Sequence, residues 1–128
     1  MNYKYNAKNV RSALREALHI IVSGETSGER AFVNLNYKEN DVKIKRTLDA
    51  LPDEKVMDIA DQVYPAMSDF ERKAVNTVYH LTEGSERLRV SSLPISWAMG
   101  ASVTVADGLR YAQQVGRLDG LLDLNSLS

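Results

Sequence analysis

Residues 8–23, KNVRSALREALHIIVS, decide the fold class of this chain. Apolar residues recur in this stretch at the i, i+3, i+4, i+7 spacing that places them on one face of an α-helix. That face holds Val10, Ala13, Leu14, Ala17, Leu18 and Ile21. The opposite side holds Lys8, Arg11, Arg15 and Glu16. The pattern predicts an amphipathic helix with a solvated polar side, which ends at Ser23-Gly24.

The chain after this helix continues in short segments of helical pattern. Asn40 is suited to cap a helix over 41–51, and Pro52 ends it. Asp53 then caps a helix with the apolar stripe of Val56, Ile59, Ala60 and Val63, which Pro65 closes. Residues 31–37 fit either a short helix or a strand, and we favour the helix.

Two longer helices complete the predicted domain. Ser68 and Glu71 have the S-x-x-E spacing of a capping box, which starts a helix that continues to Gly84. The last helix covers about 95–115, with a break or kink near Gly100 and Gly108. We therefore predict an all-α fold of five or six helices in a single domain, 1–116, with one short strand pair as the alternative for part of it. A leucine-rich tail, 117–128, follows.

Composition limits the classes of function. The chain has 128 residues, no cysteine and two histidines, so disulfides and thiolate metal sites are excluded and we expect no metal and no cofactor. No apolar run approaches the roughly 20 residues of a membrane helix. The first residues lack the apolar core of a signal peptide, which favours the cytoplasm.

The charge is unevenly distributed along the chain. Residues 1–46 carry nine basic and five acidic side chains, whereas residues 47–71 carry one basic and seven acidic. Two short clusters are basic, namely Lys43, Lys45 and Arg46, and Arg87 with Arg89. Such side chains neutralise nucleic-acid phosphates, and their contacts depend on salt. They are the candidate nucleic-acid contacts, and solvated charge near helix ends is the alternative.

Carboxylates and histidines give no catalytic constellation. Glu54, Asp58 and Asp61 lie opposite an apolar stripe, so we expect them to be solvated rather than desolvated as general acid–base catalysis requires. They remain candidates for contact with a basic partner. His19 and His80 lie on different predicted helices and are expected at the surface or its boundary. We expect no catalytic residue and no enzyme.

Trp97 and the leucines of the tail suggest surplus apolar surface. Leu121, Leu122 and Leu124 follow the last helix break, and a chain of this size has little core to cover them. We therefore expect these residues to dock on a protein partner or on a second copy, so that the protein is a dimer.

The order of several positions is similar to that of a known family. These positions are Ile21-Val22, Ser27, Phe32, Leu48-Asp49-Ala50-Leu51, Ala60 and Leu81-Thr82-Glu83-Gly84-Ser85. In this order the chain resembles the D subunit of the bacterial flagellar transcriptional activator over roughly residues 9–100. The resemblance implies an all-α dimer that acts on promoters with a zinc-binding partner subunit. It carries over no functional residue, because the matching positions are structural.

The sequence thus favours a cytoplasmic, non-enzymatic binding protein, in its most specific form a dimeric transcription-regulator subunit that reaches DNA through a partner. One alternative is a small phage-type inhibitor or adaptor that binds a host protein complex. Another is a small-ligand binder at a subunit interface, with Arg30 or Arg110 in the pocket.

Overall fold

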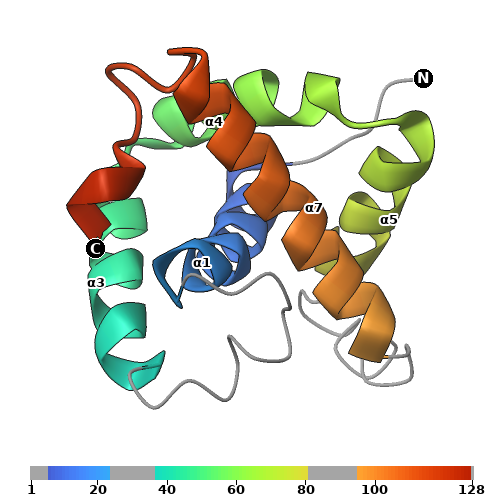
Figure 1. Cartoon of the computed structure of the whole chain (residues 1–128), viewed down its shortest axis with the longest axis horizontal. Coiled ribbons are helices and arrows are strands. Elements are labelled where there is room, and N and C mark those ends of the chain that lie inside the picture. Colours follow the sequence, from blue (N-terminus) through green and yellow to red (C-terminus); the bar gives the residue numbers. More distant parts are fainter. Residues whose placement is uncertain (1–5, 24–36, 81–94, 128) are drawn as a thin grey trace.

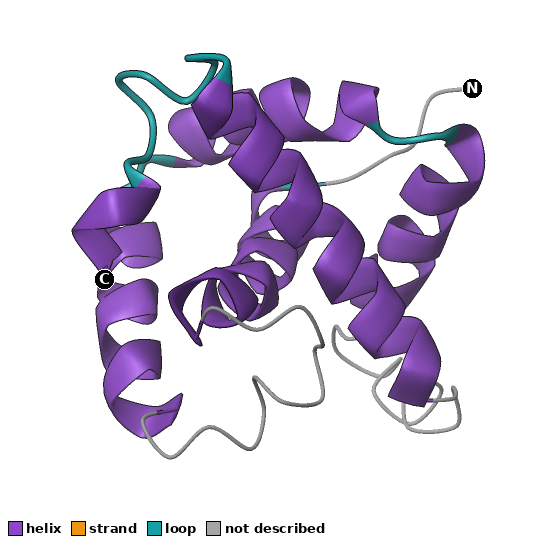
Figure 2. Ribbon diagram, in the orientation of Figure 1, coloured by secondary structure: helices purple, strands orange, loops and turns teal. Residues whose placement is uncertain are grey.

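The computed structural model describes residues 6–23, 37–80 and 95–127, and every regular element among them is helical (Figure 2). The α-helices are α1 (Ala7–Ser23), α3 (Tyr37–Ala50), α4 (Asp53–Val63), α5 (Asp69–His80) and α7 (Ile95–Gln114). The short 3-10 helices are η1 (Tyr64–Ala66) and η3 (Leu124–Leu127). The prediction of an all-α single domain is confirmed. Residues 31–36 lie outside the described residues, and Tyr37 begins α3.

Helix α1 is the centre of the domain. It contacts α3, α4, α5 and α7, and α7 crosses in front of it with α3 and α5 on opposite sides (Figure 1). The predicted stripe from Val10 to Leu18 is fully buried, whereas Ile21 is only partly buried. His19 and Ile20 are buried as well, so the buried face of α1 is wider than the sequence pattern predicts.

Helix α7 runs without interruption from Ile95 to Gln114, so the predicted break is wrong. Gly108 serves close packing instead. A Cβ built at Gly108 would lie 2.7 Å from Val63 Cγ1 and 3.5 Å from the carbonyl oxygen of Val63. The missing side chain lets α7 approach the end of α4.

Helix boundaries agree with the capping signals of the sequence in one of three cases. Ser68 and Glu71 form the predicted capping box: Ser68 N donates to Glu71 Oε1 at 2.9 Å, and Glu71 N donates to Ser68 Oγ at 3.1 Å. Two predicted caps are wrong. Asn40 lies inside α3, and Pro52 rather than Asp53 occupies the N-cap position of α4, with no side-chain cap bond. Asp53 instead pairs with Arg11 of α1.

The leucine-rich tail is part of the core, and the prediction that it exposes its leucines is wrong. Gly116 and Gly120 adopt positive φ angles of 79° and 77°, which turn the chain back toward α1 and α3 after α7. Four leucines are thereby buried, namely Leu118, Leu122, Leu124 and Leu127. Gln113 Oε1 accepts a hydrogen bond from Leu124 N at 2.7 Å, which fixes the returning segment.

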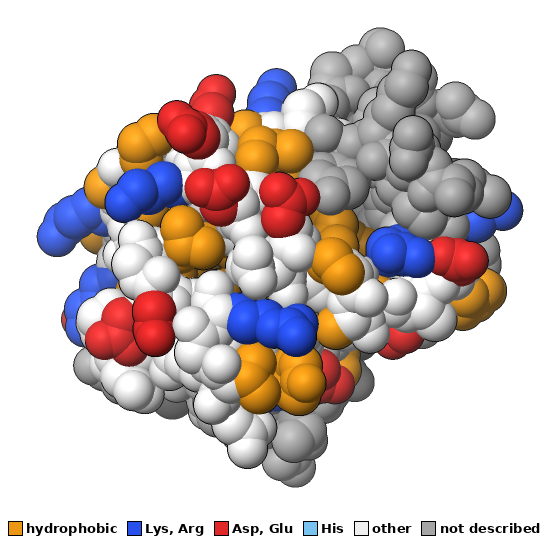
Figure 3. Space-filling view, turned by 90° about the horizontal axis from the view of Figure 1, so that it is seen from above, with side chains coloured by type: hydrophobic (Ala, Val, Ile, Leu, Met, Phe, Trp, Pro, Cys, Tyr) orange, Lys and Arg blue, Asp and Glu red, His pale blue; other side chains and the backbone are white. Residues whose placement is uncertain are grey.

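The described helices include none that combines the length and apolar character of a membrane span. The face seen from above in Figure 3 carries acidic and basic side chains side by side, with hydrophobic patches between them. This face therefore does not form a pole of one charge.

Candidate nucleic-acid interface on helix α3

Helix α3 has little hydrophobic anchorage of its own. Only Ile44 and Leu48 are buried, and both point to the core. A helix with two buried side chains needs other contacts to hold its position, and α1 supplies them through two arginines.

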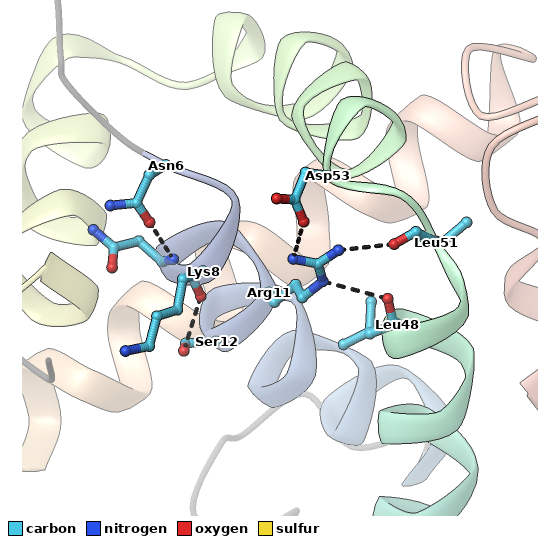
Figure 4. Close-up of polar contacts among 8 residues, drawn as sticks. Asn6, Lys8, Arg11, Ser12, Leu48, Leu51 and Asp53 are labelled. Carbon is cyan, nitrogen blue, oxygen red and sulfur yellow. Dashed lines mark hydrogen bonds and ion pairs between the residues drawn. The ribbon is translucent and has the colours of Figure 1, made fainter.

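Arg11 holds the C-terminal end of α3 (Figure 4). Its Nη2 donates to Leu51 O at 2.7 Å, and its Nε donates to Leu48 O at 3.4 Å. The last carbonyl groups of a helix have no partner within the helix, so this guanidinium satisfies part of that need. Its Nη1 also donates to Asp53 Oδ1 at 2.6 Å, which ties α1 to the start of α4.

Arg15 and His19 hold the N-terminal half of α3 through Asp41. Arg15 binds both carboxylate oxygens, with Nε to Oδ1 at 2.8 Å and Nη2 to Oδ2 at 2.5 Å. His19 Nε2 lies 2.8 Å from the same Oδ1, and the imidazole is only 2% exposed. The His19 ring stacks on Tyr37, with ring centroids 3.9 Å apart and planes 10° apart.

The electrostatics of this cluster follow from the pairing. The hydrogen bond from Arg15 is the largest cause that lowers the pKa of Asp41 to about 2, and the hydrogen bond with His19 adds to it. The same pair raises the pKa of Arg15. Asp41 is therefore an anion across the physiological pH range, and the cluster links α1 to α3 by charge-assisted hydrogen bonds.

Glu16, next to Arg15 on α1, has a carboxylate oxygen whose hydrogen-bonding capacity is not satisfied by any described residue. Its Oε2 is buried and has no hydrogen-bond partner within the described ranges of the chain. Burial is the main reason that its pKa is raised. Burial also raises the pKa of Tyr79, whose hydroxyl lies 2.6 Å from Ser102 Oγ.

The sequence missed this cluster. It placed His19 at the surface or its boundary, which is wrong, because the imidazole is buried. It placed Arg15 and Glu16 on the side opposite the apolar stripe, where the Arg15 side chain is 42% exposed but Glu16 is partly buried. The spacing of Arg15 and His19 shows that they share one helix face. Nothing local indicates that Asp41, more than 20 residues later, completes the group.

The outer face of α3 carries exposed cations. Lys38, Lys43, Lys45 and Arg46 are exposed, and none of their charged groups takes part in an ion pair or hydrogen bond with residues 6–23, 37–80 or 95–127. Arginines of the other described helices have acidic partners: Arg72 pairs with Asp69, and Arg110 pairs with Asp107 at 3.3 Å. The acidic side chains of Glu39 and Asp49 are also exposed on α3, which leaves basic charge in excess on this face.

The remaining predicted site residues are dispersed. Glu54, Asp58 and Asp61 are exposed on α4, as expected of a solvated face. Arg87, Arg89 and Arg30 lie outside the described residues, as does the side chain of Trp97, whose backbone is in the first turn of α7. Leu121 is half-buried, and Leu122 and Leu124 are covered by their own domain, so these two do not offer the free apolar surface expected of them.

The described part of the chain holds no cluster of three or more His, Cys, Asp or Glu residues able to bind a metal ion. Comparison of the chain with protein-family models, with curated proteins and with solved structures gives no match. The fold and the site together define an all-α domain in which α3 is held by polar contacts with α1 and exposes basic side chains to solvent.

Proposed function

We propose that this protein is a non-enzymatic, dimeric regulator of transcription, and that the outer face of α3 contacts the phosphates of duplex DNA. The observation that carries the proposal is a set of cations without an ion-pair partner among the described residues, Lys43, Lys45 and Arg46, on a helix that α1 holds near both ends.

The contacts of Arg11 and of Asp41 with its partners explain why this face suits binding. Arg11 and Asp41 fix the helix at opposite ends, so the cations are displayed on a backbone that does not need to become ordered on binding. A pre-ordered surface loses less conformational entropy when it binds. Contacts to phosphates set the position of a protein on DNA without reading its sequence, so DNA selectivity belongs to the partner subunit in this proposal.

The test is a titration of a labelled DNA duplex by fluorescence anisotropy over a series of salt concentrations. Each phosphate contact contributes about 0.9 to the slope of log K against log salt. Changing Lys43, Lys45 and Arg46 together to Gln is expected to flatten that slope by up to about 3 and to weaken binding at low salt.

The matched control changes three cations outside α3, Lys8, Lys55 and Arg117, to Gln, so that net charge falls by the same amount. The control is expected to keep most of the wild-type slope. Equal loss in both triple variants would assign the binding to overall charge, and absence of DNA binding by the wild type at low salt would refute the proposal.

Exposed carboxylates on α4 favour the second candidate, an inhibitor or adaptor that binds a basic surface of another protein. Glu54, Asp58 and Asp61 share one exposed face of that helix. In an affinity capture from cell lysate, changing all three to Lys should abolish recovery of a defined complex. Recovery of the same complex by the triple variant would exclude the α4 face as its contact.

A further inference from the structure

Phe70 is the most exposed of the large hydrophobic residues that the structure describes. Its exposed fraction is 81%, compared with 56% for Val42 and 48% for Tyr111. It is the second residue of α5, and the capping box of Ser68 and Glu71 fixes the helix start beside it. The aromatic ring is thus held out from its own domain on an ordered helix.

A groove of about 500 Å³ lies next to Phe70, between α5 and α7. Its lining on α7 is small, with Gly100, Ala101 and Thr104, and Ala74 and Thr77 face it from α5. A Cβ built at Gly100 would have no heavy atom within 4 Å. The described part of the chain therefore carries a bulky apolar side chain and, beside it, an apolar groove that no described side chain fills.

The groove also has charges of both signs at its edge. Glu71 and Lys73 both line it, and Lys73 has no ion-pair partner among the residues that the structure describes. An interface between two identical chains with two-fold symmetry must be self-complementary, because each residue meets its counterpart set on the other copy. An aromatic ring beside an open groove, and an acid beside a base, satisfy that requirement.

The exposed face is larger than this groove alone. A second hollow, lined by Pro65, Met67 and Tyr111, shares Glu71 and Thr104 with the first, so the two are neighbours on this side of the molecule. Helix α3 lies on the other side of α1 from α5 (Figure 1), so a contact through α5 and α7 leaves the basic face of α3 free.

We propose that the α5–α7 groove is the interface of a two-fold homodimer, in which Phe70 of each copy enters the groove of the other and Lys73 meets Glu71 of the other copy. This inference rests on the dimeric state in the proposed function and gives it a location. The groove takes the place of the leucine-rich tail as the proposed dimer contact, because the leucines of the tail are buried in the core of their own domain.

The test is sedimentation velocity over a range of protein concentrations, without DNA. The wild type is expected to dimerise, and Phe70→Ser is expected to raise the dissociation constant at least about tenfold, because aromatic anchors dominate interface energies. Val42→Ser, which removes an exposed apolar side chain from α3, is the control and should dimerise like the wild type.

A charge exchange tests the two-fold geometry. Circular dichroism first checks that each variant is folded, because Glu71→Lys also removes the capping bond from Ser68 N. Lys73→Glu alone places two acids together across the interface, and Glu71→Lys alone places two bases together. Each variant should be weakened as a homodimer, whereas an equimolar mixture of the two should form heterodimers, because both cross-pairs are then opposite in charge.

A wild type that is monomeric at every concentration, a dimer insensitive to Phe70→Ser, or a mixture no stronger than its components would each overturn the inference. None of these results affects the salt-dependence test of α3, so failure of the interface and failure of DNA binding are distinguishable.

Discussion

At the scale of single residues, Asp41 is the group on which the position of α3 depends. Its pKa falls from 3.8 to about 2 on folding, mainly through the hydrogen bonds from Arg15. A carboxyl with a lowered pKa contributes stability that is fully present above its unfolded pKa and is lost as the pH falls through its folded value. The contribution should therefore be complete at neutral pH and decline between about pH 5 and pH 2.

Asp41→Asn is expected to lower the free energy of unfolding by about 2 kcal/mol at neutral pH, as is typical of a hydrogen bond to a charged group. Urea unfolding measured at a series of pH values checks this, and the difference from the wild type should shrink in acid. Asp49→Asn, an exposed position on the same helix, is the control. A deficit that stays constant down to pH 2 would contradict the assignment to Asp41 ionisation.

Glu16 should behave in the opposite way. Burial raises its pKa above 4.5, so ionisation of Glu16 costs stability as the pH rises through the folded value. Glu16→Gln removes that cost and is expected to stabilise the protein at pH 7, with the gain disappearing below the unfolded pKa. Thermal melts at pH 7 and pH 4 measure the gain, with exposed Glu39→Gln as control. Equal effects at both pH values would exclude ionisation as the cause.

At the scale of elements, the confirmed predictions depend on neighbours within one helix turn, although the local caps predicted at Asn40 and Asp53 are wrong. The capping box of Ser68 and Glu71 and the stripe of α1 are of this kind, and both are confirmed. The role of Gly108 is not local. Its sequence context suggests a break, but the glycine is needed because Val63 of another helix occupies the space of its side chain.

The packing at Gly108 predicts that the effect of Gly108→Ala on the free energy of unfolding differs in sign between the wild type and a Val63→Ala variant. Gly108→Ala should destabilise the wild type by about 1–2 kcal/mol, because the added Cβ overlaps Val63, whose β-branched side chain is stiff. In a Val63→Ala background the overlap is gone, and the better helix propensity of alanine should make the same change neutral or stabilising. Denaturant unfolding of the four proteins gives the coupling energy directly. Additive effects would show that the two positions do not meet.

At the scale of the whole molecule, composition and periodicity are enough to predict an all-α single domain, because the spacing of apolar residues identifies the buried face of each helix. They do not place the polar cluster, because Arg15 and Asp41 meet only after α1 and α3 pack together. The basic residues of α3 were identified from the sequence as charges. Whether they form an ordered binding surface depends on the hydrogen bonds from Arg11 and Arg15 that fix α3. The local sequence pattern does not predict those bonds.

The tail gives the clearest consequence of whole-molecule packing. A chain shortened to residues 1–116 would keep its core if the tail were a separate segment, as its composition suggests. The structure predicts the contrary, because the truncation removes four buried leucines, each worth about 1.5–3 kcal/mol when buried, from a domain whose expected total stability is about 5–15 kcal/mol. The shortened chain should therefore lose its cooperative thermal transition in circular dichroism.

Point variants separate core loss from simple shortening of the chain. Leu124→Ala in the full chain should cost about 2–5 kcal/mol, whereas Asn125→Ala, next to it and exposed, should cost little. If the shortened chain melts at the wild-type temperature, or if both point variants are neutral, the segment after Gly116 does not belong to the core. The surplus apolar surface expected from the sequence would then return to the tail, which would compete with the α5–α7 groove as the contact surface for a second copy.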